Sequence, residues 1–466
     1  MNEQNNKAKF QTDLTQGSVA GQLIRFSGPF LLSMLIQQSL SMADLLIVSY
    51  FSGDKTVAGV NNGGQLVFLA VSIAIGLSVG GTILIGQYFG AKRMEEVQKT
   101  ATTMLTALLI VSVVLALVFI AFGGSFLRII QIPEESFAEA RTYLTICMCG
   151  LPFIFLYNAI SAILRGMGDS KRPLYFIAAA CVVNIIIDLI LVAGFGFGAA
   201  GVAIATVVAQ AGSVVASAIF LVRSGFMFDF RPRSFVIYRD KLRMILKLGI
   251  PASLSQIAVN FSFLLMTALV NGYGVSVAAA AGLAGRFNGF AIMPMIAVSN
   301  SVSMMSAQNF GANRHDRALR TMKVGIACFV VIGFPLFALV QLFPEYIMAV
   351  LSQSEAVIEA GVIYMRAFSW DYVVVPFVFC FMGLVTGAGH SHITMINTFI
   401  TSIAVRVPVA LLLSRYFELG LPGIGYAAPA ASFSGLIFLF CYIMTGRWRN
   451  VTIHKQGRPS PPPSLE

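Results

Sequence analysis

The sequence predicts an all-helical membrane protein with twelve transmembrane helices arranged in two six-helix lobes. Three observations predict this class: the composition, the length of the apolar stretches and the distribution of positive charge. Of the 466 residues, 57% are apolar or aromatic and only 11% are Asp, Glu, Lys or Arg. Because a soluble protein carries about 25% charged residues, this chain cannot cover a globular surface in water. The composition therefore excludes a soluble enzyme and a disordered protein.

Twelve apolar stretches are long enough to cross a bilayer, which requires about 20 apolar residues for each crossing. They are continuous runs without the alternation of barrel strands, and a lipid-exposed segment must satisfy its own backbone hydrogen bonds, so each is predicted to be a helix. The first six cover 27–49, 60–85, 100–122, 142–164, 173–193 and 199–222. The last six cover 249–270, 278–303, 322–343, 364–385, 393–414 and 424–445.

Positive charge orients these helices. With the N-terminus placed in the cytoplasm, 24 of the 31 Lys and Arg residues fall on the cytoplasmic side and 5 on the outer side. Cytoplasmic loops of membrane proteins carry this excess, so both termini are expected to be cytoplasmic. The same bias accounts for the net charge of +11 without a nucleic-acid partner.

A repeat divides the chain into halves. GQYFGAKR at 86–93 recurs as AQNFGANR at 307–314, and LRGMGDS at 164–170 recurs as VTGAGHS at 385–391, both shifted by 221 residues. Six helices separate equivalent points, so the halves are expected to be related by a pseudo-twofold axis along the membrane normal, with substrate between them. The predicted parts are a cytoplasmic N-terminal segment, an N-lobe, a cytoplasmic linker, a C-lobe and a disordered cytoplasmic tail, at 1–25, 26–222, 223–247, 248–446 and 447–466.

No motif indicates an enzyme, a cofactor or a resident metal. The G-x-G-x-x-G pattern within GFGFGAAG at 194–201 joins two predicted spans and lacks the strand–helix context of a nucleotide site. The six Cys lie in apolar runs, and the Cys and His residues do not show metal-ligand spacing. We therefore expect a non-enzymatic protein without a cofactor.

Ionisable residues inside the predicted spans of the first half indicate an ion site, because each is costly in hydrocarbon without a cavity or a partner. Asp44 and Asp188 lie in the first and fifth spans, with Asn184 one turn from Asp188 and Thr206 in the sixth span. Two carboxylates with neutral oxygens suit a cation or a proton. The alternative is a structural hydrogen-bond cluster.

The second half lacks these acids, because the positions 221 residues beyond Asp44, Asn184 and Asp188 are Leu265, Val405 and Val409. It carries Arg286, Asp371 and Arg406 inside spans instead. An unpaired charge there would be costly, so we expect Asp371 to hydrogen-bond at least one of the two arginines. A structural or gating role and direct substrate contact both remain open for this group.

Polar residues on the first and seventh spans extend the set of candidates. Gln37, Ser41 and Asp44 follow helical spacing and form a polar stripe along one face. The candidates for lining a substrate cleft are Gln37, Ser41, Gln256, Asn260, Arg286, Asp371 and Arg406.

Together these motifs resemble the multidrug and toxic compound extrusion (MATE) family. The resemblance covers about residues 18 to 450 and rests on the two six-helix halves, the repeated GQYFGAKR and AQNFGANR, and LRGMGDSKRP at 164–173. Asp44 together with VNIIID at 183–188 is similar to the prokaryotic DinF-type branch. The resemblance implies a V-shaped, two-lobe monomer of the prokaryotic plasma membrane that works by alternating access. It would exchange organic cations or other amphipathic toxic compounds for protons or sodium.

By position, the resemblance implies an N-lobe site for the coupling ion, H⁺ or Na⁺, formed by Asp44, Asn184, Asp188 and Thr206, with Tyr143 and Asn158 nearby. Other branches of the family have an acidic residue in the seventh span, where this chain has only Gln256 and Asn260. Two alternatives remain. A lipid-linked-saccharide flippase of the same superfamily would need a strongly cationic cavity, and an intramembrane enzyme would need a convergent catalytic set.

Overall fold

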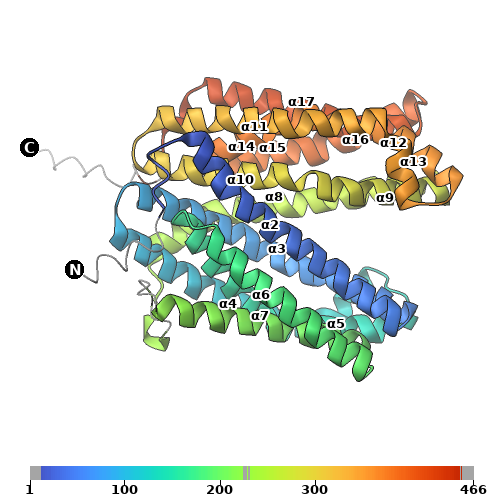
Figure 1. Cartoon of the computed structure of the whole chain (residues 1–466), viewed down its shortest axis with the longest axis horizontal. Coiled ribbons are helices and arrows are strands. Elements are labelled where there is room, and N and C mark those ends of the chain that lie inside the picture. The colour runs from blue at the N-terminus through green and yellow to red at the C-terminus, as the bar shows by residue number, and fades with distance from the viewer. Residues whose placement is uncertain (1–11, 224–227, 229–230, 452, 454–466) are drawn as a thin grey trace, which may run out of the picture. The chain divides into compact units, whose positions relative to one another are not determined.

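The computed structural model describes residues 12–223, 228, 231–451 and 453, and every element in these ranges is helical (Figure 1). The first half contains α2 (Val19–Phe51), α3 (Asp54–Gly90), α4 (Met94–Ile129), α5 (Glu134–Gly166), α6 (Lys171–Asp188) with the π-helical turn η2 (Leu189–Gly194), and α7 (Gly198–Arg223). A 3₁₀ turn, η3 (Pro232–Ser234), precedes the second half.

The second half begins with one long helix and contains more interruptions than the first. Its elements are α8 (Arg239–Asn271), α9 (Val275–Ala291), α10 (Met293–Gly311), α11 (His315–Leu342), α12 (Pro344–Leu351), α13 (Glu355–Phe368), α14 (Asp371–Gly387), α15 (Ser391–Phe399), η4 (Ile400–Val405), α16 (Arg406–Leu411), η5 (Leu412–Tyr416), α17 (Leu421–Met444) and η6 (Arg447–Arg449). The predicted N-terminal segment up to residue 11 and the predicted tail from residue 454 lie outside the described residues.

The expectation of an all-helical membrane protein is confirmed. Eleven helices in the described ranges are long and apolar enough to cross a membrane, and the bent pair α13 and α14 supplies a twelfth span. Each predicted apolar stretch lies within one of these spans to within one residue. The helices run longer than the stretches, as in α3, because helical hydrogen bonding continues into the polar ends.

The tenth span, predicted as one helix over 364–385, is broken. α13 ends at Phe368 and α14 begins at Asp371, with a bend of 45° between them. The backbone at the break is satisfied by side chains, because Gln341 Nε2 and Ser369 Oγ each donate to the carbonyl of Arg366, both at 3.0 Å. An apolar surrounding requires such partners for backbone groups that leave a helix.

The helices gather into two compact units. The first contains Thr12, Arg25–Thr82 and Glu95–Ile257, and the second contains Asp13–Ile24, Ile83–Met94 and the residues from Ala258 onward. In the first unit α5 and α6 pack on α7, and in the second α10 packs on α11 and α14. The end of α3, with the motif at 86–93, therefore belongs with the second unit.

The two copies of the repeated motif pack against each other within the second unit. A Cβ atom on Gly90 would overlap the backbone carbonyl of Gln308, and a Cβ atom on Gly311 would overlap that of Gln87. The contacts are reciprocal because each glycine meets the glutamine of the other copy. Glycine allows the two backbones this close approach.

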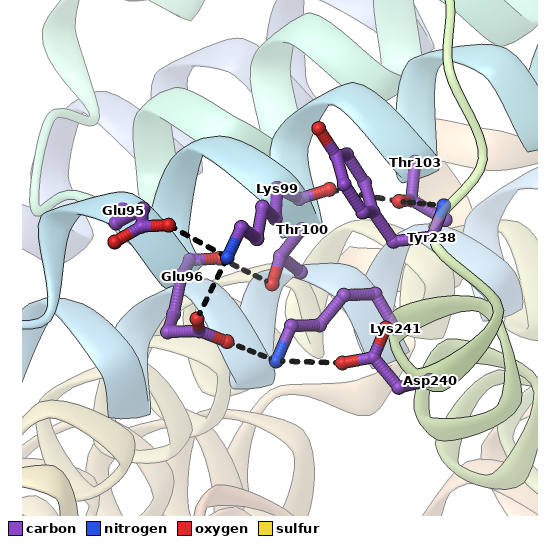
Figure 2. Close-up of polar contacts among 8 residues, drawn as sticks. All are labelled: Glu95, Glu96, Lys99, Thr100, Thr103, Tyr238, Asp240 and Lys241. Carbon is purple, nitrogen blue, oxygen red and sulfur yellow. Dashed lines mark hydrogen bonds and ion pairs between the residues drawn. The ribbon is translucent and has the colours of Figure 1, made fainter.

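The segment before α8 is held along α4 inside the first unit (Figure 2). The backbone nitrogen of Tyr238 donates to Thr103 Oγ1 at 3.1 Å. Lys241 is only 2% exposed, and its ammonium group forms ion pairs with Glu96 and with Asp240 (Figure 2). These contacts fix where the long helix α8 begins.

We expect Lys241→Ala to lower the stability of the folded protein by about 1–2 kcal/mol. Removing one partner of a buried ion pair costs about 3–5 kcal/mol, but Glu96 is partly exposed and keeps Lys99 as a second partner. The apparent Tm of the purified protein in detergent measures the change. Arg243→Ala is the control, since Arg243 is an exposed cation two residues further along α8. Equal Tm values for the two variants would contradict a structural role for Lys241.

Candidate functional site

Four of the predicted site residues meet inside the first unit. They come from α2 (Asp44), α6 (Asn184 and Asp188) and α7 (Thr206). Asn184 and Asp188 are fully buried. The Asn184 amide is oriented so that its nitrogen faces the two carboxyl groups. The nitrogen donates to Asp44 Oδ1 at 3.0 Å and to Asp188 Oδ2 at 3.1 Å. The amide oxygen accepts from the backbone nitrogen of Thr206 at 3.0 Å. Asn184 therefore holds the two carboxyl groups side by side.

The carboxyl groups of Asp44 and Asp188 lie within hydrogen-bonding reach of each other. Two carboxyl groups bond to each other only when one of them carries a proton, so a pair at this separation is able to share one proton. Within the described residues, Asp188 Oδ1 is buried without a hydrogen-bond partner. The pair can release its proton and then offers several oxygen atoms to a small hard cation.

Local helix geometry places these side chains. Asn184 and Asp188 lie four residues apart, hence on one face of α6. Asp188 is the last α-helical residue before the π-helical turn η2, and π-helical turns occur frequently at functional sites. Val192 of this turn packs with Val48 of α2 in a buried apolar cluster. The cluster anchors α2 and the end of α6 about one turn beyond Asp44 and Asp188.

Tyr143 and Asn158, both on α5, differ in their relation to the acidic pair. Tyr143 packs on the same apolar cluster, lies within electrostatic range of both carboxyl groups and hydrogen-bonds to Cys147. Asn158 Nδ2 donates to the carbonyl of Ile154 on its own helix at 2.8 Å. In the described part of the chain Asn158 makes no hydrogen bond to either aspartate.

The expected bond from Asp371 to an arginine is wrong. Asp371 is 7% exposed and hydrogen-bonds to Ser432, and the described residues contain no ion pair between it and Arg286 or Arg406. Arg406 instead lies over the ring of Phe263, with 4.8 Å from Cζ to the ring centroid, which is a favourable cation–π distance. The break before α14 sets the direction of the Asp371 side chain. The expected pairing used only the depth of each residue in its span, which does not give this direction.

The remaining cleft candidates are divided between the two units, with Asn260 and Arg286 in the second unit and the others in the first. Gln37, Ser41 and Arg286 are exposed, and Gln256 and Asn260 are half-buried on α8. Sequence reasoning missed Ser432, the partner of Asp371, and Asn288, whose Oδ1 accepts from the hydroxyl of Tyr372 at 3.0 Å. Both are uncharged residues of apolar spans, and no pattern in the sequence distinguishes them.

Comparison with known proteins decides the family. The MatE family profile matches residues 29–190 and again residues 251–412, two stretches of equal length. The chain belongs to the MATE family. The first stretch includes Asp44, Asn184 and Asp188, and the second includes Asp371 and Arg406. The resemblance seen in the motifs is confirmed at this level, and MATE proteins are transporters rather than enzymes.

Relatives cover the MATE chain almost completely. The probable multidrug resistance protein YoeA of Bacillus subtilis is 32% identical over 91% of this chain and 93% of its own length. The multidrug export protein MepA of Staphylococcus aureus is 20% identical over 86% of this chain and 88% of its own length. The outward-facing structure of a multidrug resistance MATE transporter superposes with a TM-score of 0.87 at 23% identity, covering 94% and 98% of the two chains. At this level of sequence identity, the structural similarity shows a shared fold only.

Proposed function

We propose that this MATE protein is a cation-coupled multidrug antiporter that exports organic cations or amphipathic toxic compounds by alternating access. The buried cluster of Asp44, Asn184 and Asp188 carries the proposal, because two adjacent carboxyl groups in a membrane-spanning unit serve no packing purpose and are costly to bury. The names of the relatives, a probable multidrug resistance protein and a multidrug export protein, support the drug-like substrates. The bacterial relatives support a prokaryotic plasma membrane, and the charge distribution supports cytoplasmic termini.

Coupling follows from the chemistry of the acidic pair. Antiport requires that the driving ion and the drug weaken each other's binding, and this coupling is reciprocal. A proton shared by Asp44 and Asp188 neutralises one charge, whereas sodium would bind when both are ionised and would use the oxygens of Asn184 and Thr206. The close approach of the two carboxyl groups, which lets them share one proton, supports the proton as the coupling ion. The pair with VNIIID also favours the DinF-type branch.

Transport in proteoliposomes tests the proposal. Purified protein is reconstituted with a fluorescent organic cation, and a proton gradient or a sodium gradient is imposed separately. We expect drug movement to follow an imposed proton gradient and to be unaffected by sodium at constant pH. Drug movement driven by sodium alone would replace the proton by sodium as the coupling ion. A protein that moves no drug under either gradient would contradict antiport.

A further inference from the structure

A basic pocket of about 400 Å³ lies in the second unit, whereas the acidic pair belongs to the first unit. Its walls are the turns at 90–93 and 311–314, which end the two copies of the repeated motif, together with Thr15 and Gln16. These turns contain none of the residues of the proposed ion site. The pocket is therefore a feature that the proposed function leaves unexplained.

The two turns are built alike. Lys92 and Asn313 hold equivalent places and both have positive φ, 58° and 59°. The next backbone nitrogen reaches back into its helix in each turn, from Arg93 to the carbonyl of Tyr88 at 2.9 Å and from Arg314 to that of Asn309 at 2.7 Å. The reciprocal glycine contacts then lock one turn against the other, so the walls of the pocket are rigid before any ligand binds.

The cations in and beside the pocket outnumber the acids near it. Lys92 and Arg93 are exposed and Arg314 Nη1 donates to the carbonyl of Thr15 at 2.7 Å, a neutral partner that orients the guanidinium group. Within the described residues none of these three side chains forms an ion pair. The nearby Asp13 accepts from the backbone nitrogen and the hydroxyl of Thr15, and Asp316 is exposed at the start of α11.

The acids that follow Arg93 in the sequence have other partners. Glu95 pairs with Lys99 at 2.7 Å, and Glu96 pairs with Lys99 and Lys241 (Figure 2). Arg317, in the first turn of α11, adds a further cation and donates to the carbonyls of Gln16 and Gly17, both at 2.8 Å. It also interacts electrostatically with Asp13. The pocket thus has a lasting excess of positive charge.

We propose that this pocket binds the phosphate group of an anionic ligand, supplied either by a phospholipid headgroup or by free phosphate. Arginine presents a planar fork that matches phosphate oxygens, and lysine adds a point charge. A volume of about 400 Å³ lies within the usual range of ligand sites and has room for a group attached to the phosphate. The charge distribution predicts this end of the helices to be cytoplasmic, where basic pockets between spans bind anionic headgroups.

Thermal stability of the purified full-length protein tests this inference, because a ligand that binds the folded state raises the apparent Tm. The probes are dioctanoyl-phosphatidylglycerol, dioctanoyl-phosphatidylcholine, and sodium phosphate with ionic strength matched by sodium chloride. We expect phosphatidylglycerol to raise the Tm and phosphatidylcholine to have little effect. The variant Lys92→Gln/Arg93→Gln should need about 30-fold more phosphatidylglycerol for half of the effect.

The matched control is Arg320→Gln/Lys323→Gln, which removes two exposed cations of α11 that lie outside the pocket and should leave the titration unchanged. If the double pocket variant is unstable without ligand, Lys92→Gln alone should show about a 5-fold shift. Stabilisation by sodium phosphate as strong as that by the lipid would identify free phosphate as the source. The proposal is overturned if neither phosphatidylglycerol nor sodium phosphate stabilises the protein. It is also overturned if phosphatidylcholine stabilises it as well as phosphatidylglycerol, or if the control variant loses the stabilisation to the same extent as the pocket variant.

Discussion

Asp188→Asn is expected to abolish gradient-driven drug efflux, with a loss of about 100-fold or more, the upper range of coupling between two sites. Asparagine keeps the size of the side chain but can neither carry the shared proton nor contribute a negative charge to a cation. Asp44→Asn should have the same effect, because both carboxyl groups accept a hydrogen bond from Asn184 and lie close enough to share a proton. Efflux is measured in proteoliposomes at equal amounts of folded protein.

Two substitutions distinguish this loss from a general disturbance. Asn158→Ala removes an amide that bonds only to its own helix α5, and Gln256→Ala removes a half-buried amide of α8. Both variants should retain most of the efflux. The aspartate variants should still bind drug, with an affinity that no longer changes with pH. Near-normal efflux by Asp188→Asn would remove this residue from the mechanism.

Gly90→Ala and Gly311→Ala are expected to destabilise the protein by about 3 kcal/mol or more, so that little folded protein is recovered. The added methyl group would overlap a backbone carbonyl, of Gln308 in one case and Gln87 in the other. Backbone on both sides cannot move aside without separating α3 from α10, and overpacking of this kind costs about 1–3 kcal/mol even against side chains. The apparent Tm and the yield after size-exclusion chromatography measure the effect.

Gly285→Ala is the control within the same unit. It also lies inside a helix, α9, but no atom lies within 4 Å of an added methyl group. Alanine is the better helix former by about 0.5–1 kcal/mol, so this variant should be as stable as the parent or slightly more stable. Parent-like stability of Gly311→Ala would show that the two motifs do not pack as closely as the structure indicates.

The spans could be predicted because the bilayer imposes a length on every crossing segment. An apolar run as long as 199–222 has few structural alternatives to a membrane-spanning helix, and α7 begins and ends within one residue of it. The break at Ser369 and Trp370 could not be predicted, because neither residue is a strong helix breaker and the partner that stabilises the break, Gln341, is distant in the sequence.

The meeting of Asp44, Asn184 and Asp188 could be expected, since three polar residues at similar depth in one half have few other ways to avoid lipid. The same reasoning failed for Asp371. The position of a residue along a helix gives its depth in the membrane but not the direction of its side chain around the helix axis. The carboxyl group of Asp371 points toward Ser432. The basic pocket was missed for a different reason, since Lys92 and Arg93 were counted only as topological charges.

The π-helical turn after Asp188 has a consequence for comparing sequences. A π-helical turn holds one residue more than the α-helical turn it replaces, and one residue corresponds to about 100° of rotation in an α-helix. A relative that lacks η2 therefore aligns with this chain through Asn184 and Asp188 and again from Gly198, with a single-residue gap between them. An alignment without that gap would match Val192, which faces the buried cluster, to a residue facing a different direction.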